Sequence, residues 1–302
     1  MPTKKSNMPT KKRKPAVRKP KADAQAVPQA ERVCAVYQTT VDSASQGRLA
    51  FALRSLLRNT SPDVDVVVMC DSPLRDAKQL LAADIKGRVY REVYDMSSYL
   101  ADVGIVPPKT WNRRWPFVAM YRLGVPIHPA FDQYGRVLYC DTDTLVRGEG
   151  VRDLLAADLS GCEVRGAADV GWQQGRIPQL YKSLNPEYAA RLRSVLGCDN
   201  MVRAYVNSGV ILWNLNEIRK DLPWYRERLA MYWDEERRGK FGFPDQDFIN
   251  AMMRVRADLS TRFNMIAGSF GNEDVVRHYV GGRYDEQMRD AFAAGLLLDA
   301  RK

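Results

Sequence analysis

The sequence has no long apolar run, few cysteines and only two histidines, and each shortage excludes something. No stretch of its 302 residues is apolar over the length needed to cross a bilayer. The basic N-terminus is followed by no apolar segment of the signal-peptide type. The five cysteines show no metal-ligand spacing, and an odd number without a disulfide framework is typical of a reducing compartment. We therefore expect a soluble protein of the cytoplasm.

Positive charge is abundant but uneven. The chain carries a net charge of +10, and residues 1–30 hold nine lysines and arginines against one acidic residue, which leaves the remaining body nearly neutral. This segment also has five prolines and no aromatic residue, so we expect a disordered tail. The tail is suited to nucleic acid or an anionic membrane surface, its "KKRK" could direct nuclear import, or it is only a solubilising segment.

The body, in contrast, alternates strand and helix patterns. Apolar β-branched runs at residues 32–37, 64–70 and 88–94 predict strands, and leucines recur at helical spacing between them. Strands that are apolar on both faces are typical of a mainly parallel sheet covered by helices. We predict an α/β fold.

An acidic pair ends the next predicted strand. Residues 137–140, "VLYC", run directly into Asp141, Thr142 and Asp143. Alternation along an extended chain turns both carboxylates to one side, where they repel each other unless a cation lies between them. In such sheets ligands bind beyond the carboxyl ends of the strands. The alternative is an acidic pair facing water, since the same spacing recurs at Asp63 and Asp65.

Four features of the second half matter below. Gly209 lies inside a predicted strand, which often marks the close approach of a ligand or another backbone. Residues 223–239 predict an exposed helix, and 243–253 a second helix with Asp245 at its N-cap. His278 lies in a last short strand, where the ordinary role would be a hydrogen-bonded core histidine.

Four segments in this order resemble the retaining glycosyltransferases of family 8, which include glycogenin and bacterial galactosyltransferases. They are "FVAMYRLGVP" with "RVLYCDTDTLV", "YVNSGVILWNLNEIR", "FPDQDFINAMM" and "RHYVGG". The resemblance implies the GT-A fold, in which a nucleotide-binding sheet joins a smaller acceptor-side region, with a UDP-sugar donor and Mn²⁺, or Mg²⁺, as cofactor. It places the transferase domain at residues 31–284, after the tail of 1–30 and before a C-terminal helix or tail at 285–302.

The resemblance also assigns roles to residues. It implies metal ligation by Asp141, Asp143 and His278, in keeping with the chemistry of a leaving diphosphate, whose charge a cation would neutralise. Contacts to the donor sugar are implied for the residues that match "NSG" and "DQD" and for one basic residue, namely Asn207, Ser208, Asp245, Gln246 and Arg122. Each of three residues also has a structural alternative. Asn207 could satisfy backbone groups at a kink in the strand, Asp245 could be only a helix cap, and Arg122 could be a charge on a helix surface.

Two segments depart from the family pattern. Members usually follow the histidine motif with a Lys-Pro-Trp-like segment whose lysine holds the diphosphate, but this chain has Arg283 and Tyr284 there. Arg283 is a candidate substitute, although its register is off. For the first strand, the resemblance leaves two alternatives: Asp42 takes the place of the usual acidic residue, or Thr39 and Thr40 contact the uracil. A degraded, inactive member is the alternative.

The sequence thus predicts a metal-dependent retaining transferase that moves a hexose from a UDP-sugar to a glycan, lipopolysaccharide or protein. The tail adds nucleic acid as an alternative acceptor, and "TWNRRWPF" at 110–117 could form an acceptor wall or a loop anchored by buried tryptophans. Rival hypotheses are a non-catalytic nucleic-acid-binding protein on the same scaffold and a nucleotidyltransferase.

Overall fold

A computed structural model describes the body of the chain, and all its described elements belong to one unit, Glu31–Lys302. The described residues are 32–40, 43–74, 81–82, 84–107, 116–169, 182, 184–196, 205–236, 243–267 and 273–296. The basic tail, Asp42, the tryptophans of "TWNRRW" and most of the helix predicted after residue 74 lie outside them.

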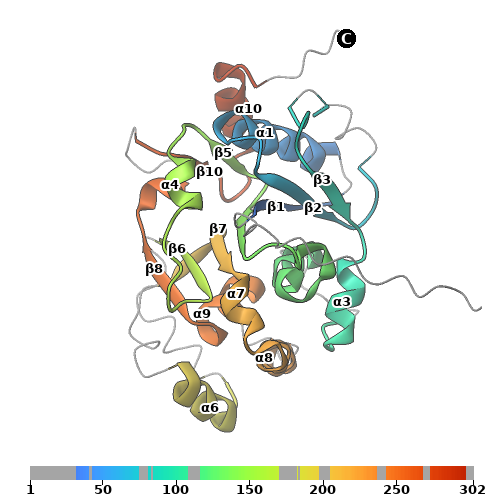
Figure 1. The fold of residues 1–302 in the computed structure, drawn as a ribbon, viewed down its shortest axis with the longest axis vertical. Helices are drawn as coiled ribbons and strands as arrows, with labels where there is room; N and C mark the ends of the chain where they lie inside the picture. Colours follow the sequence, from blue (N-terminus) through green and yellow to red (C-terminus); the bar gives the residue numbers. More distant parts are fainter. Residues whose placement is uncertain are drawn as a thin grey trace, which may run out of the picture. The chain divides into compact units, whose positions relative to one another are not determined.

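A seven-stranded sheet forms the centre, in the order β3-β2-β1-β4-β7-β6-β8 (Figure 1). Its strands are β1 (Val33–Thr39), β2 (Asp65–Cys70), β3 (Tyr90–Val93), β4 (Arg136–Cys140), β6 (Val164–Ala168), β7 (Val206–Asn214) and β8 (Val255–Leu259). The first four are parallel, and β7 runs antiparallel to both of its neighbours. The predicted α/β fold with a mostly parallel sheet is confirmed.

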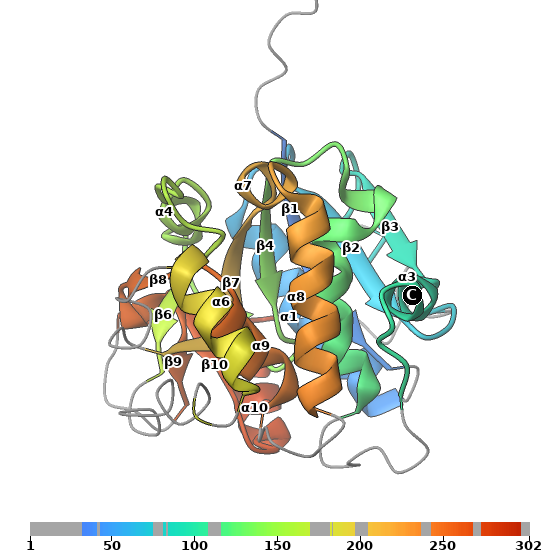
Figure 2. The same cartoon turned by 90° about the horizontal axis from the view of Figure 1, so that it is seen from below.

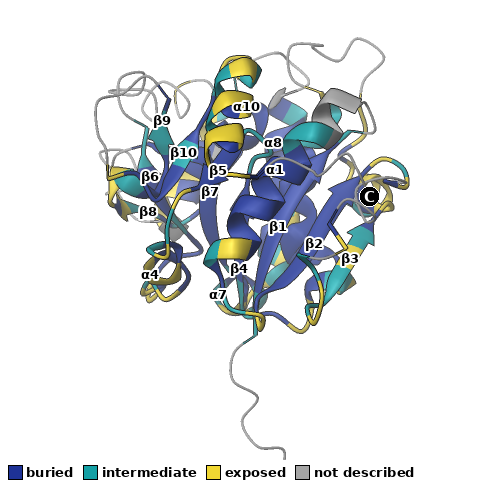
Figure 3. Ribbon diagram, turned by 90° about the horizontal axis from the view of Figure 1, so that it is seen from above, coloured by how far each residue is buried: buried dark blue, intermediate teal, exposed yellow. Residues whose placement is uncertain are grey.

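Helices cover both faces of this sheet, as the two-sided apolar strands predicted. The helices are α1 (Ser43–Asn59), α3 (Met96–Asp102), α4 (Val151–Leu155), α6 (Pro186–Leu196), α7 (Leu215–Arg219), α8 (Leu222–Glu236), α9 (Pro244–Met252) and α10 (Tyr284–Ala293), with 3-10 segments η1 (Phe117–Ile127), η2 (Pro129–Phe131) and η4 (Thr261–Phe263). Figure 2 shows α8 and α9 in front of one face, and Figure 3 shows α1 in front of the opposite face. Among the described residues no helix is both long and apolar enough to span a membrane.

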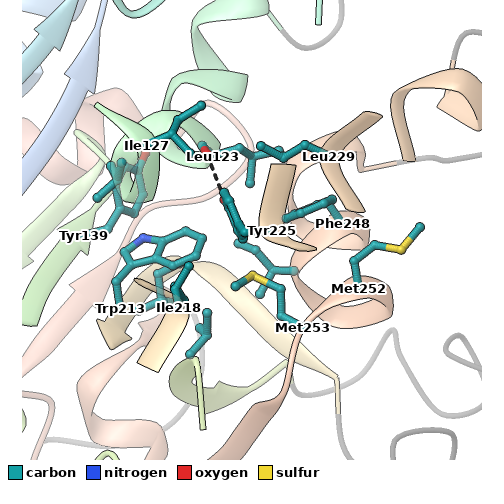
Figure 4. Close-up of a cluster of buried hydrophobic side chains, with 14 of the residues drawn as sticks. Leu123, Ile127, Tyr139, Trp213, Ile218, Tyr225, Leu229, Phe248, Met252 and Met253 are labelled. Carbon is teal, nitrogen blue, oxygen red and sulfur yellow. Dashed lines mark hydrogen bonds between the residues drawn. The ribbon is translucent and has the colours of Figure 1, made fainter. Parts of the chain in front are cut away.

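Side chains alternate between two cores across the sheet. Cys34 and Val36 of β1 join the core under η1, α8 and α9, whereas Ala35 and Tyr37 join the core under α1 and α4. Figure 4 shows the first core, in which Trp213, Tyr225 and Phe248 lie together and the Tyr225 hydroxyl donates to the Leu123 carbonyl at 2.8 Å. The described cysteines Cys34, Cys70, Cys140 and Cys162 are buried thiols.

The prediction that residues 223–239 form an exposed helix is wrong in its burial. Helix α8 buries Tyr225, Leu229 and Trp233 in the first core, together with the charged Arg228. Arg228 is only 1% exposed because its guanidinium makes a two-pronged contact with Glu163, at 2.8 and 2.6 Å. The polar residues of this segment suggested a solvent-exposed face, but the ion pair with Glu163 allows Arg228 to lie in the protein interior.

A second, three-stranded sheet has the order β5-β10-β9, with β5 (Thr144–Val146), β9 (Met265–Ile266) and β10 (Val276–His278). Strand β10 is antiparallel to β5, and His278 pairs with Thr144. Because β5 begins directly after the acidic pair, this pairing carries a histidine from late in the chain to Asp143. Helix α10 packs near β5 and α1, and Gln287, fully buried, donates to the Thr142 carbonyl at 2.9 Å.

Replacing Glu163 by Gln should destabilise the fold strongly. The substitution leaves the Arg228 charge buried without its partner, which costs about 3–5 kcal/mol of unfolding free energy. Urea denaturation measures this loss. The matched control is Glu227→Gln, which breaks the half-exposed pair with Arg191 and should cost less than about 1 kcal/mol. Equal losses in the two variants would contradict the role assigned to the buried pair.

Candidate active site

Asp141, Asp143 and His278 come together at the carboxyl end of β4. One ligand atom from each lies within 4.8 Å of the others. His278 Nε2 is 3.2 Å from Asp143 Oδ1 and 3.8 Å from Asp141 Oδ2. The imidazole is 2% exposed and both carboxylates are partly buried, so the water-facing alternative for the acidic pair does not describe this site. Two carboxylates and one imidazole could hold a divalent cation.

Electrostatics within this cluster favour a positive charge. Burial alone would lower the pKa of His278, but the carboxylates of Asp143 and Asp141 outweigh it and raise that pKa above its usual value. Burial likewise opposes ionisation of Asp143, and the imidazole beside it brings the pKa of that carboxyl below its usual value. A proton on His278 therefore offsets the acidic pair whenever no cation does so.

Asn264, which sequence reasoning missed, orients the imidazole. Its Oδ1 lies 2.9 Å from His278 Nδ1, and its Nδ2 donates to Asn207 Oδ1 at 2.9 Å. An amide oxygen only accepts hydrogen bonds, so in the neutral ring the proton belongs on Nδ1. Nε2 then faces the two carboxylates with its lone pair, as a metal-ligating histidine requires. His278 is thus hydrogen-bonded and also placed to bind a cation.

Gly209 gives the imidazole its space. A Cβ built on Gly209 would lie 2.1 Å from His278 Cε1, and the Gly209 carbonyl accepts from the Asp141 N–H at 2.8 Å. The sequence predicted a close approach at this glycine. The approaching group is a side chain, the ring of His278, and not another backbone.

Arg122 lies beside this cluster and is buried, which excludes its reading as a surface charge. It is 4% exposed, and its guanidinium contacts Asp141 Oδ1 at 2.8 Å and Asp245 Oδ2 at 3.1 Å. It also donates to the Ser208 carbonyl at 2.9 Å and lies 4.3 Å above the centre of the Tyr139 ring. Burial would lower the pKa of Arg122, but the nearby negative groups, Asp141 and Asp245 foremost, outweigh it. The pKa therefore lies above its usual value, and the guanidinium stays charged.

Asp245 and Gln246 lie in the first turn of α9, both buried. The predicted N-cap is wrong: the helix begins with Phe243 at the N-cap and Pro244 after it, since proline fits the first helical position. Asp245 Oδ2 is instead 3.0 Å from Ser208 Oγ, and Gln246 Oε1 accepts from the Ser208 N–H at 2.8 Å. Burial raises the pKa of Asp245, with Arg122 opposing.

The same helix fixes the start of β7, where Asn207 and Ser208 lie. Asn250 of α9 accepts from the Val206 N–H at 2.7 Å and donates to its carbonyl at 2.8 Å, as a neighbouring strand would. Asn207 Oδ1 accepts from the Gly209 N–H at 2.9 Å, which agrees with the alternative that it satisfies backbone groups at this point. The "NSG" and "DQD" segments are therefore brought together.

Asp169 joins this group and was also missed. Its Oδ2 accepts from Asn207 Nδ2 and from Gln246 Nε2, each at 3.2 Å. Asp169 follows β6, which runs in the same direction as β4, because both are antiparallel to β7. The argument that selected Asp141 at a strand end would have found Asp169 as well.

Of the residues predicted to contact the nucleotide, the structure describes Thr39, Thr40 and Arg283. Thr39 ends β1, is 3% exposed, and lies beside the end of β4, to which β1 pairs. Thr40 follows it, and Asp42 lies outside the described residues. Among the described residues, Arg283 pairs with Glu286 at 3.4 Å on the surface of α10, and the structure does not bring it to the acidic pair.

The comparisons point to one family. The model of "Glycosyl transferase family 8" matches residues 112–282, a range that includes Arg122, Asp141, Asp143, Asp245 and His278. Strands β1, β2 and β3 and helices α1, α3 and α10 lie outside that range. No curated protein matches the sequence.

Several solved glycosyltransferase structures share the GT-A fold of this chain. The bifunctional glycosyltransferase WbbM is 17% identical with a TM-score of 0.60 over 87% of this chain, which spans 50% of WbbM. The galactosyltransferase LgtC, solved with donor and acceptor sugar analogues, is 19% identical with a TM-score of 0.58, and the match covers 87% of this chain and 100% of LgtC. Mouse xyloside xylosyltransferase 1 is 16% identical, at 0.55, over 82% and 97%.

Gly209→Ala should weaken cation binding. The new Cβ meets the His278 ring and displaces it from the acidic pair, so we expect Mn²⁺ affinity to fall by about ten- to a hundredfold. Isothermal titration calorimetry with Mn²⁺ measures this, with circular dichroism to check folding. Gly148→Ala is the control, because nothing lies within 4 Å of a Cβ there. Unchanged Mn²⁺ affinity in Gly209→Ala would count against the site.

Proposed function

The chain belongs to glycosyl transferase family 8, and on that basis we propose that it moves a hexose from a UDP-sugar to an acceptor, with retention of the anomeric configuration. The observation that carries the proposal is the convergence of Asp141, Asp143 and His278 next to the buried ion pairs of Arg122 with Asp141 and Asp245. The proposal of retention rests on the family resemblance alone.

The residues present fit a divalent cation. His278 presents Nε2 to the acidic pair because Asn264 holds Nδ1, and ligands of oxygen and nitrogen suit Mn²⁺ or Mg²⁺. Bound there, the cation would neutralise negative charge that develops on the departing diphosphate.

The chain's own residues account for the remaining charge. Arg122 contacts the carboxylates of Asp141 and Asp245, so that one guanidinium offsets negative charge on both of them. As the bond from the sugar to the phosphate breaks, its electron pair leaves with UDP and the anomeric carbon becomes electron-poor. Asp245 and Gln246 supply a carboxylate and an amide oxygen that favour such a centre. The acceptor hydroxyl then bonds to this carbon, and its proton passes to an oxygen of the departing diphosphate.

Donor recognition is the next part of the proposal. Polar side chains from β6, β7 and α9 form one hydrogen-bonded group suited to sugar hydroxyls: Asp169, Asn207, Ser208 and Gln246. At the end of β1, the proposed contacts of the uracil are either Asp42 or the pair Thr39 and Thr40. The acceptor is a glycan, a lipopolysaccharide or a protein, and the cytoplasm remains the predicted location.

Asp143→Asn should abolish metal-dependent hydrolysis of a UDP-sugar. The variant replaces a charged ligand by a neutral one, and we expect turnover with Mn²⁺ to fall by at least about a hundredfold while the fold persists. Screening of several UDP-hexoses for release of UDP is the measurement. Asp153→Asn, which alters an exposed carboxylate paired with Arg262, is the control.

Full turnover in Asp143→Asn would refute the assigned site. The same assay with the unaltered protein tests retention, because proton NMR identifies the sugar anomer released first. A β-anomer from an α-linked donor would overturn retention and leave the metal site standing.

The basic tail supports a second candidate, transfer to nucleic acid. Nearly all the net charge of the chain lies in residues 1–30, and such a segment binds polyanions in a strongly salt-dependent way. Nuclear import and simple solubilisation are the other readings of the same residues.

Deletion of residues 1–28 separates these readings. UDP-sugar hydrolysis should not change, because the site uses residues of the body only. If nucleic acid is the acceptor, transfer to it should fall most at low salt. Transfer rates measured against salt concentration for both proteins give the answer, and superimposable curves would exclude tethering through the tail.

A further inference from the structure

A second arginine, Arg48, lies at the edge of the candidate metal cluster. Arg48 is in α1, outside the range that the family model matches. Its Nη1 is 3.8 Å from Asp143 Oδ2, and its guanidinium carbon lies 5.1 Å from the centre of the Tyr284 ring. The Arg48 side chain is 20% exposed, so it borders the cluster and still reaches solvent.

A bound diphosphate would need such a cation. The charges of Asp141 and Asp143 already balance those of one divalent cation, so the phosphate oxygens remain uncompensated. Arg122 cannot serve them fully, because it is 5% exposed at its side chain and its donors contact Asp141, Asp245 and Ser208. Arg283 lies exposed on α10 and pairs with Glu286. Among the described cations at the cluster, Arg48 alone combines proximity to Asp143 with exposure.

The contact of Arg48 with Asp143 is loose. A separation of 3.8 Å is too long for a hydrogen bond, so the attraction is between charges only. A cation bound to Asp143 would cancel this attraction and repel the guanidinium. The planar N–H donors of Arg48 would then be available to phosphate oxygens. Arginine binds such oxygens two at a time through parallel hydrogen bonds.

Tyr284 holds Arg48 in place. A Cβ at Gly47 would lie 3.1 Å from the Tyr284 hydroxyl oxygen, so the glycine lets this ring lie against α1. The Tyr284 ring also lies against the guanidinium of Arg48, the residue that follows Gly47. Such a contact with an aromatic face favours arginine over lysine. Tyr284 stands in the segment "GGRYDE", where the sequence departs from the lysine-containing pattern of its family.

We propose that Arg48, supported by Tyr284, binds the diphosphate of the nucleotide donor. The guanidinium comes from the first helix and takes over the charge that a lysine of the C-terminal segment would otherwise provide. This inference rests on the proposed function, since it names a further residue of the same donor site.

The test is calorimetric titration of UDP in the presence of Mn²⁺. Arg48→Gln should weaken UDP binding by about ten- to a hundredfold, because charge-assisted hydrogen bonds to phosphate are lost, and Arg48→Lys should fall between. Mn²⁺ affinity without nucleotide should stay equal or rise, since a positive charge leaves the surroundings of Asp143. Arg58→Gln, farther along α1, is the control and should bind UDP normally. Tyr284→Ala should weaken UDP binding, whereas Tyr284→Phe, which keeps the ring, should not.

Several outcomes would overturn the inference. They are normal UDP binding by Arg48→Gln, joint loss of Mn²⁺ and UDP binding, which would mean a structural role, or the loss appearing in Arg283→Gln instead. If the unaltered protein binds no UDP, the proposed donor is wrong. The probe is then inorganic pyrophosphate with Mn²⁺, for which the same loss is expected in Arg48→Gln, and absence of pyrophosphate binding would overturn the inference as well.

Discussion

Repulsion between the carboxylates of Asp141 and Asp143 is the constraint on which the site depends. Each surrounding element supplies something that compensates it. Strand β10 brings the imidazole of His278, η1 brings the guanidinium of Arg122, and α1 brings Arg48 at longer range. A third carboxylate, the buried Asp245, shares Arg122 with Asp141. Removing any cation would leave like charges in a place with little water, where their repulsion is strong.

Much of the fold followed from pattern alone. Apolar runs at the positions of β1, β2 and β3 predicted a parallel sheet, and the rule that ligands bind at strand ends led to Asp141 and Asp143. Burial was harder to read. Arg228 and Glu235 gave α8 an exposed character, and Asp245 resembled an N-cap, because a single sequence does not reveal which polar groups pair with each other across the fold.

The missed residues show where sequence reasoning ends. Asp169 had a signal, since it directly follows a strand, β6, at the same edge of the sheet as Asp141. Asn264 and Arg48 had none: one precedes a two-residue strand and the other lies in an ordinary amphipathic helix. Their positions depend on contacts between segments far apart in the chain. Gly209 lay between these cases, because its small size signalled a close approach but did not identify His278.

The hydrogen bond from Gln287 to Thr142 has a consequence for synthesis on the ribosome. It joins residues 145 positions apart and closes the turn between Asp141 and Asp143. A nascent chain that has completed β4 therefore carries Asp141 and Asp143 but neither His278 nor Gln287. It cannot yet form the cluster of Asp141, Asp143 and His278. Since chains emerge N-terminal end first, the sheet can form before the site does. We therefore expect the proposed cation site to form only in a polypeptide whose translation has passed α10.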